Sequence, residues 1–355
     1  MSGPPIASGP LRRSLVFATD ELDPLADLAR RAEAAGLDRV WTTEYVHRDA
    51  LARALAIALA TERIEVATGI AYAFTRVPLA MAGLAADVQR MSGGRFGLGI
   101  SSGTRGVRRW YGAEFDPPAP RIAAYAEALR AAWTENPDLH APPKIYAAAL
   151  NPIMTRTVAR SCDGALLHAL ALSRTHLHER VLPALREGLD QRSSDGTFEI
   201  AVWCITAIDE DEERARELAR RQLAFYLSTP SYRTVTAGTS WENVADDIRT
   251  AFDESGRKAS WGELSNLIPD AVLDELTISG SPAVARERAL ALEAELRELG
   301  VTELVFQLAG ADVSAEELVS SCEQIADVLG PKGPSPRQPN PVGAPAGAPN
   351  PEVSE

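Results

Sequence analysis

The chain has 355 residues, of which 45% are hydrophobic and 24% charged, so it can bury a large core and stay in solution. Its formal net charge of −13 argues against a nucleic-acid-binding surface, because binding to phosphates needs a basic face. Cys162, Cys204 and Cys322 lie far apart and form no CxxC pair, which argues against a disulfide framework or a metal site. No run resembles a signal peptide or a membrane span. We therefore expect a cytoplasmic protein without membrane or nucleic-acid partners.

Between residues 11 and 330, short apolar runs alternate with longer segments of helical periodicity. Eight runs are predicted to be strands: residues 15–19, 37–41, 64–68, 95–100, 145–149, 164–168, 198–207 and 303–308. Predicted helices follow them, at residues 23–35, 51–60, 78–91, 121–133, 152–161, 175–189, 212–228 and 315–329. Extra helical segments, without a strand, are predicted before the last strand, from about residue 241 to 276 and from 281 to 299. Repeated strand–helix units imply parallel strands, so the predicted fold is a single (β/α)8 TIM barrel.

The two ends of the chain differ from this pattern. Residues 331–355 are rich in Pro, Gly, Ala and Asn and contain few large apolar residues. Such a segment buries too little surface to offset the entropy of ordering it. We predict a disordered tail at 331–355 and a flexible N-terminus at 1–10, with the barrel domain at 11–330.

The active site of a (β/α)8 barrel lies at the carboxyl ends of the strands, an end that we call the mouth. In the loop after the fourth predicted strand, small residues precede Arg105, Arg108 and Arg109. Small residues let backbone N–H groups approach an anion, and guanidinium groups add charge-assisted hydrogen bonds. We therefore predict an anion-binding loop. The alternative is a solvated loop whose arginines pair with Glu114 and Asp116.

Glu44, Tyr45 and His47 form a cluster of titratable residues directly after the second predicted strand. A carboxylate, a phenol and an imidazole can exchange protons with a substrate or orient a cofactor ring. In the alternative, Glu44 binds backbone amides while His47 and Arg48 cap the next helix. The residues alone leave both open.

Five blocks stand in a characteristic order and spacing along the chain: residues 34–41 (AAGLDRVW), 60–64 (ATERI), 68–70, 84–87 and 91–99 (MSGGRFGLG). They resemble the luciferase-like monooxygenase superfamily. Two later segments, residues 221–232 and 279–282, look like its F420-dependent branch. The resemblance covers about residues 11–330.

The resemblance implies a barrel that binds FMN or the deazaflavin F420 at the mouth, and it places Glu44 near the cofactor ring. It also implies a non-proline cis peptide at Gly69–Ile70 that bulges against the ring. The predicted catalytic residues are Glu44, Tyr45 and His47. The predicted cofactor-binding residues are Thr68, Gly69, Ile70, Ser101, Ser102, Gly103, Arg105, Ala148, Ala149, Leu150, Asn151 and His168, and no metal site is predicted.

Four features depart from the family pattern. Ser101 and Asn151 stand where the family has glycine near phosphate, and Tyr45 stands where many relatives have histidine. The connection between Trp133 and Lys144 is shorter than the insertion that helps to cover the active site in relatives. These departures imply a more open mouth, a different substrate or a weaker cofactor site.

The leading hypothesis is an F420-dependent oxidoreductase that moves a hydride between the deazaflavin and a small organic substrate. The first alternative is an FMN-dependent monooxygenase that uses O2. The second alternative is a barrel that has lost its cofactor chemistry and acts as a binding or accessory protein. The family is often dimeric, so the expected assembly is a homodimer.

Overall fold

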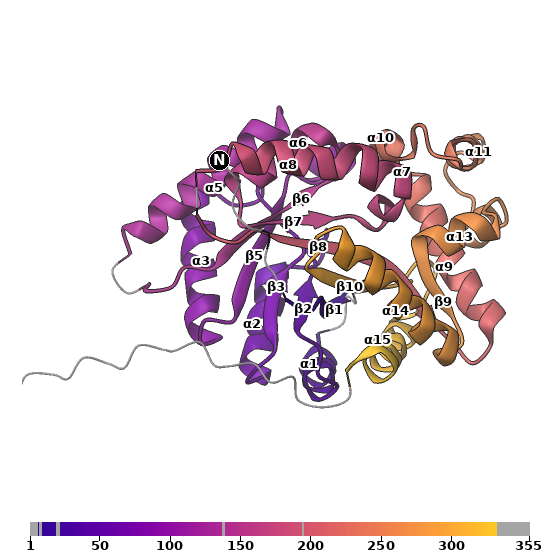
Figure 1. The fold of residues 1–355 in the computed structure, drawn as a ribbon, viewed down its shortest axis with the longest axis horizontal. Helices are drawn as coiled ribbons and strands as arrows, with labels where there is room; N and C mark the ends of the chain where they lie inside the picture. The colour runs from indigo at the N-terminus through magenta and orange to yellow at the C-terminus, as the bar shows by residue number, and fades with distance from the viewer. Residues whose placement is uncertain (1–5, 7–8, 19–21, 137–138, 194, 332–355) are drawn as a thin grey trace, which may run out of the picture.

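The computed structural model describes residues 6, 9–18, 22–136, 139–193 and 195–331, and it confirms the predicted barrel (Figure 1). Eight strands form the closed ring: β1 (Arg12–Phe17), β2 (Arg39–Thr42), β3 (Glu65–Thr68), β5 (Phe96–Ser101), β6 (Lys144–Ala149), β7 (Gly164–Leu167), β8 (Glu199–Ile208) and β10 (Glu303–Leu308). All pairings are parallel, and the ring closes because β10 pairs with both β1 and β8.

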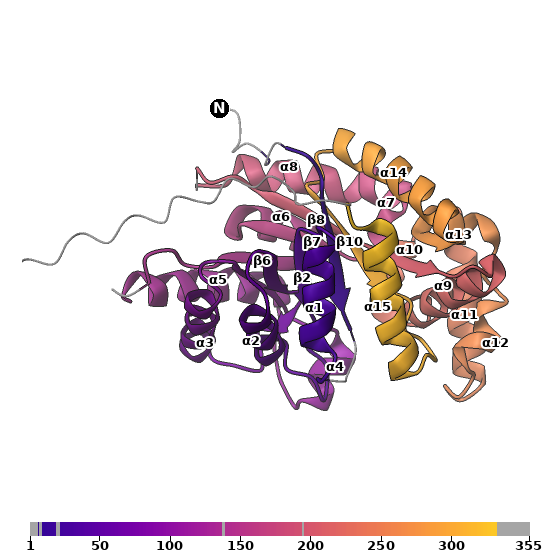
Figure 2. The same cartoon turned by 90° about the horizontal axis from the view of Figure 1, so that it is seen from below.

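Helices surround the barrel (Figures 1 and 2). Those at predicted positions are α1 (Leu25–Ala34), α2 (Ala50–Ala60), α3 (Pro78–Met91), α5 (Pro118–Thr134), α6 (Pro152–Ser161), α8 (Leu182–Asp190), α9 (Glu212–Leu227), α14 (Pro282–Glu298) and α15 (Ala315–Leu329). Their starts follow local chemistry. The Asp49 carboxylate accepts from Leu51 and Ala52 N–H, both at 2.9 Å, and so begins α2. Ser314 and Glu317 form a capping box before α15.

Several elements differ from the prediction. The segment 241–276 is divided into α11 (Glu242–Glu254), α12 (Trp261–Ser265) and α13 (Asp270–Leu276), and the predicted helix 175–189 into α7 (Arg174–His176), a π-helical turn η2 (Leu177–Val181) and α8. Unpredicted elements are β4 (Ala71–Tyr72), α4 (Arg105–Trp110), η1 (Ala169–Leu172), η3 (Pro230–Tyr232), α10 (Arg233–Thr236) and β9 (Thr277–Gly280). β9 extends the sheet at the carboxyl end of β8, from Ile205 to Ile208. β9 has only four residues between two helices, which is too short for an alternating pattern to indicate a strand.

Alternate residues of each strand point into the barrel. Trp41 on β2 contacts Tyr146 on β6 and Trp203 on β8, with ring centroids 5.5 and 5.2 Å apart. Because these strands are not neighbours, the contacts lie inside the ring. Arg39 and Thr43, two positions on either side of Trp41, therefore point inward as well.

An ionic layer with a buried centre fills the amino end of the barrel. It consists of the first residue of six strands: Arg12, Arg39, Glu65, Lys144, Glu199 and Glu303. The Arg39 side chain is only 4% exposed and lies 2.6 Å from Glu303 and 2.5 Å from Glu65. Tyr146 donates a hydrogen bond to Glu199 at 2.9 Å. Opposite charges and hydrogen bonds together offset the cost of removing these groups from water.

Most of the two predicted flexible ends, namely residues 1–5, 7–8 and 332–355, lie outside the described residues. Ile6 is described, and it forms an isolated parallel bridge with Phe198 at the amino end of β8. Among the described helices, none is both long and apolar enough to cross a membrane.

Candidate functional site

Glu44 follows β2 and anchors the segment that follows β3. Its carboxylate accepts hydrogen bonds from the Tyr72 N–H and the Thr75 hydroxyl, both at 3.2 Å, and from Arg76 at 3.1 Å to each oxygen. Its own N–H donates to the Ile70 carbonyl at 3.0 Å. Glu44 therefore fixes residues 70–76 against the end of β2.

The negative charge of Glu44 is balanced by the neighbouring Arg76. Burial raises the pKa of Glu44, and the ion pair with Arg76 opposes this rise. Arg76 also pairs with Asp49, the residue that caps α2. The alternative interpretation, in which Glu44 binds backbone amides, agrees with its hydrogen bond from the Tyr72 N–H. The same interpretation placed His47 and Arg48 at the cap of α2, but the capping residue is Asp49.

The other two predicted catalytic residues lie apart from the Glu44 carboxylate. Tyr45 is 41% exposed, and its ring contacts Trp110 at 6.2 Å between centroids. His47 is exposed. In the described part of the chain, Glu44, Tyr45 and His47 share no side-chain hydrogen bond, so the geometry does not join them into one acid–base group.

The end of β3 contains the cis peptide Gly69–Ile70 that the resemblance implied. A Cβ on Gly69 would lie 2.7 Å from the ring of Trp203 and 3.0 Å from that of Trp41, so only glycine fits above these two rings. The predicted cofactor residue Thr68 is turned toward β5, where its hydroxyl donates to the Gly99 carbonyl at 2.8 Å and accepts from the Gly99 N–H at 2.9 Å.

The loop after β5 is a tight turn followed by the short helix α4. The Gly103 N–H donates to the Ser101 hydroxyl at 3.1 Å, and Gly103 has φ +59°, a conformation that favours glycine. The buried Arg108 donates to the carbonyls of Ser102 at 3.1 Å and Gly103 at 2.8 Å and pairs with Asp116 at 3.2 Å. Arg108 therefore supports the turn. Its ion pair with Asp116 is one that the alternative interpretation of this loop predicted.

Arg105 and Arg109, on the same helix, are exposed. They are the arginines of α4 that remain accessible to an anion, and they lie directly after the Ser101–Gly103 turn in the chain.

The end of β6 leads directly into α6. The Asn151 side chain accepts from the Met154 N–H at 3.0 Å and caps α6, which accounts for asparagine at this position. The Leu150 carbonyl bonds His176 Nε2 at 2.8 Å. Ala148 is half-buried and Ala149 is buried. Because both side chains are small, a ligand at this strand end would contact the backbone rather than side chains.

His168 follows β7 and packs between two tyrosines that the sequence analysis did not select. Its ring centroid lies 4.4 Å from those of Tyr226 and Tyr232. Burial lowers the pKa of His168 to about 3, so the imidazole is neutral at pH 7. Nδ1 accepts from the Leu170 N–H at 3.2 Å, which leaves the proton on Nε2.

Two further polar residues face the mouth from inside the barrel. Thr43 lies one inward position above Trp41, and its buried hydroxyl has no hydrogen-bond partner among the described residues. Gln307 on β10 donates to the Tyr226 hydroxyl. Extending the alternation of β2 beyond Trp41 would have identified Thr43. Tyr226 and Tyr232 lie in the segment 221–232, whose likeness to the F420-dependent branch was the signal that could have identified them.

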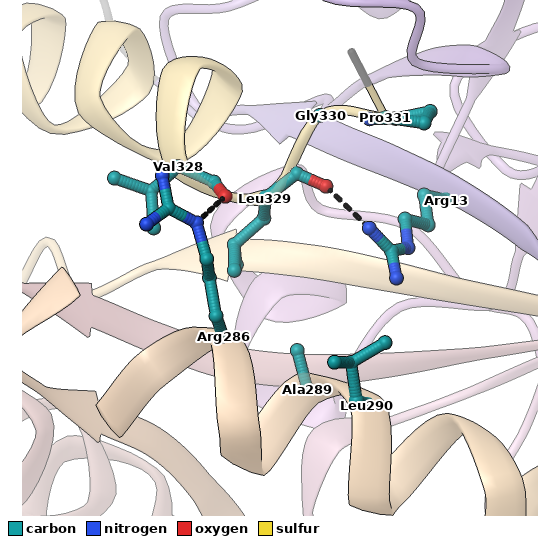
Figure 3. A pocket seen from close by; sticks show the side chains of 8 residues that line it. All are labelled: Arg13, Arg286, Ala289, Leu290, Val328, Leu329, Gly330 and Pro331. Carbon is teal, nitrogen blue, oxygen red and sulfur yellow. Dashed lines mark hydrogen bonds between the residues drawn. The ribbon is translucent and has the colours of Figure 1, made fainter. Parts of the chain in front are cut away.

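A separate recess of about 390 Å³ lies away from all these residues, between α14 and the end of α15 (Figure 3). Arg13 and Arg286 donate to the carbonyls of Leu329 and Val328 there, both at 3.0 Å. It contains none of the predicted site residues.

Known proteins resemble this chain over most of its length. A protein of Mycobacterium tuberculosis described as uncharacterized is 31% identical over 291 residues, or 74% of this chain and 84% of the relative. A 5,10-methylenetetrahydromethanopterin reductase of Archaeoglobus fulgidus is 25% identical over 297 residues, or 77% and 86% of the two chains.

Two solved structures share the fold. The coenzyme F420-dependent tetrahydromethanopterin reductase from Methanopyrus kandleri aligns with a TM-score of 0.70 at 20% identity and covers 90% of this chain and 98% of its own. The oxygenating constituent of 3,6-diketocamphane monooxygenase from Pseudomonas putida, in complex with FMN, aligns at 0.61 with 14% identity, covering 91% and 99%. The model of the luciferase-like monooxygenase family matches residues 7–303. The chain therefore belongs to the luciferase-like monooxygenase family, and it is an oxidoreductase.

Proposed function

We propose that this oxidoreductase uses F420 and transfers a hydride between the deazaflavin and a small organic substrate. One observation carries the choice of an anionic deazaflavin: in a chain of net charge −13, two exposed arginines follow the tight turn at the mouth. F420 ends in an acidic tail, and guanidinium groups bind carboxylates and phosphates. The relatives named as F420-dependent or methylenetetrahydromethanopterin reductases support the same choice.

The residues present fit such a cofactor. The Thr43 hydroxyl is buried and without a partner among the described residues, so it can bind a polar ring atom without losing another contact. Gly69 and Gly103 let the backbone pack directly against the aromatic rings beside it, which hold the loops that would contact the cofactor. Arg105 and Arg109 would hold the acidic tail, and the Ser101–Gly103 turn and Ala148–Asn151 the phosphate.

When bound, the deazaflavin supplies or accepts the hydride, and the chain must manage the proton. His168 is neutral at pH 7 and carries its proton on Nε2. Burial raises the pKa of Tyr72 and Tyr232, so both remain protonated donors, and neither hydroxyl bonds another described residue. These three groups would orient a substrate oxygen and donate to it. Glu44, with its carboxylate fully engaged, would position residues 70–76 instead of exchanging protons.

The test is a titration with F420 and with FMN in parallel, followed by fluorescence anisotropy. We expect saturable F420 binding with a Kd on the order of micromolar and weaker binding of FMN. The double variant R105A/R109A should weaken F420 binding by about tenfold, and more at low salt. The control variant R63A removes a 69% exposed charge at the start of β3 and should leave binding unchanged.

Saturable FMN binding without F420 binding would instead favour the FMN-dependent monooxygenase. Binding of neither cofactor would favour the accessory-protein alternative.

A further inference from the structure

An aromatic cluster lies at the mouth beside the segment that Glu44 anchors. We call it the aromatic rim; it consists of Tyr45, Tyr72, Phe74, Trp110 and Tyr111. These residues come from three segments of the chain: the loop after β2, the segment from β4 onward, and the end of α4.

Contacts join the rim into one surface. The rings of Tyr72 and Phe74 stack 5.1 Å apart at 17°, and the Tyr111 ring meets both edge-on at 6.0 and 5.5 Å. The Tyr111 hydroxyl donates to the Tyr45 carbonyl at 3.3 Å, and Tyr45 in turn contacts Trp110. The rim is therefore continuous from Phe74 to Trp110.

The rim is buried at its base and exposed at its edge. Tyr72 is 6% exposed, whereas Trp110 is 64%, Tyr45 41% and Tyr111 39% exposed. Among the described residues, one other aromatic side chain, Phe225 at 36%, is similarly exposed. Exposed aromatic surface gathered at one place in this way is typical of a ligand-binding or interaction surface.

The base of the rim is part of the candidate site. The Tyr72 N–H binds Glu44, and a Cβ on Gly103 would lie 3.0 Å from Phe74 and 3.2 Å from Tyr72. The Glu44 carboxylate below is already neutralised by Arg76. The rim thus presents ring faces and edges at the mouth. The buried carboxylate beside it is already paired, so it does not provide a free charge for an ionic ligand.

We infer that the aromatic rim binds the substrate, and that the substrate is a planar, uncharged aromatic or conjugated molecule. This inference rests on the proposed function, because the substrate is what the hydride transfer acts on. Planar rings stack on or meet exposed aromatic side chains better than puckered rings of similar size. A second copy of the chain is the competing occupant of such a surface, and the test separates the two.

The experiment compares 2-naphthol with decahydro-2-naphthol, which has the same carbon skeleton but puckered rings. Both are titrated into the full-length protein by calorimetry, with and without F420. We expect 2-naphthol to bind about tenfold more tightly, and the variant W110A to remove about tenfold of that affinity. The control variant L79A removes a 74% exposed side chain from α3 and should change nothing.

Three results would overturn the inference. The two probes could bind equally, or W110A could leave naphthol binding unchanged while it converts a dimer to a monomer in sedimentation. Alternatively, W110A could abolish F420 binding, which would assign the rim to the cofactor. Naphthol binding that depends on Trp110, in a chain that binds no F420, would support the inference and refute the proposed cofactor.

Discussion

The two ends of the barrel use polar residues in opposite ways. At the amino end, the first residues of six strands pair with one another, and Arg12 and Arg39 each contact Glu65, Glu199 and Glu303. At the mouth, the Thr43 hydroxyl is without a partner among the described residues, and Arg105 and Trp110 are exposed. Groups that satisfy one another stabilise the fold, and groups left unsatisfied or exposed are those that a ligand can bind.

The same strands carry both roles. On β2, Arg39 belongs to the ionic layer and Trp41 packs in the middle of the barrel, and Thr43, directly after the strand, faces the mouth. Because side chains alternate along a strand, three successive inward positions of one strand serve stability, packing and binding in turn.

The largest effect that would sharpen this contrast is expected from Arg39→Met. Removing the guanidinium takes one of two arginines from Glu65, Glu199 and Glu303 and leaves Arg12 and Lys144 to balance three carboxylates. We expect the free energy of unfolding to fall by about 3–5 kcal/mol in urea denaturation. The control is Arg31→Ala, which breaks exposed pairs with Asp327 and Glu323 and should cost about 0.2–1 kcal/mol. Equal losses in the two variants would mean that the ionic layer contributes no more than surface charge.

A smaller loss of stability, with a functional consequence, is expected from Glu44→Gln. The amide cannot accept all the bonds that hold Tyr72, Thr75 and Arg76, so we expect a loss of about 1–3 kcal/mol in unfolding free energy. If Glu44 positions residues 70–76, F420 binding should weaken while the pH profile of the reaction keeps its shape. Loss of one limb of the pH profile, with binding intact, would identify Glu44 as a proton-transfer residue.

The smallest effect concerns pH. Burial works to raise the pKa of Glu199, but Arg39, Arg12 and Lys144 outweigh it, and the pKa lies well below the ordinary value of 4.5. The unfolded chain therefore takes up a proton at a higher pH than the folded protein. This stabilisation is complete above pH 4.5 and is lost as the pH falls below it, with a slope of at most about 1.4 kcal/mol per pH unit.

The check is urea denaturation at several pH values for the wild type and Glu199→Gln. The variant should show a flatter fall in stability on acidification. An unchanged slope would show that Glu199 does not cause the pH dependence.

The sequence predicts the barrel well because strand and helix periodicities alternate regularly. It misses β9 and α4, which are short and owe their form to contacts: β9 to the free edge of β8, and α4 to the Thr104 cap. It predicts the loops of the candidate site from strand ends and family blocks. It offers the pairing of Arg108 with Asp116 and the binding of backbone amides by Glu44 only as alternatives, and it does not indicate Arg76, which contacts Glu44 only in the folded chain. Tyr226 and Tyr232 reach His168 from beyond β8 for the same reason.

Hydrogen exchange with and without F420 tests the division between the two ends most directly. The account predicts added protection in residues 42–49, 68–76, 99–110 and 149–153, and none in the strand starts at 12–14, 39–40, 199–201 and 303–304. Protection absent from the mouth, or centred on the recess between α14 and α15, would contradict the proposal that the mouth binds the cofactor.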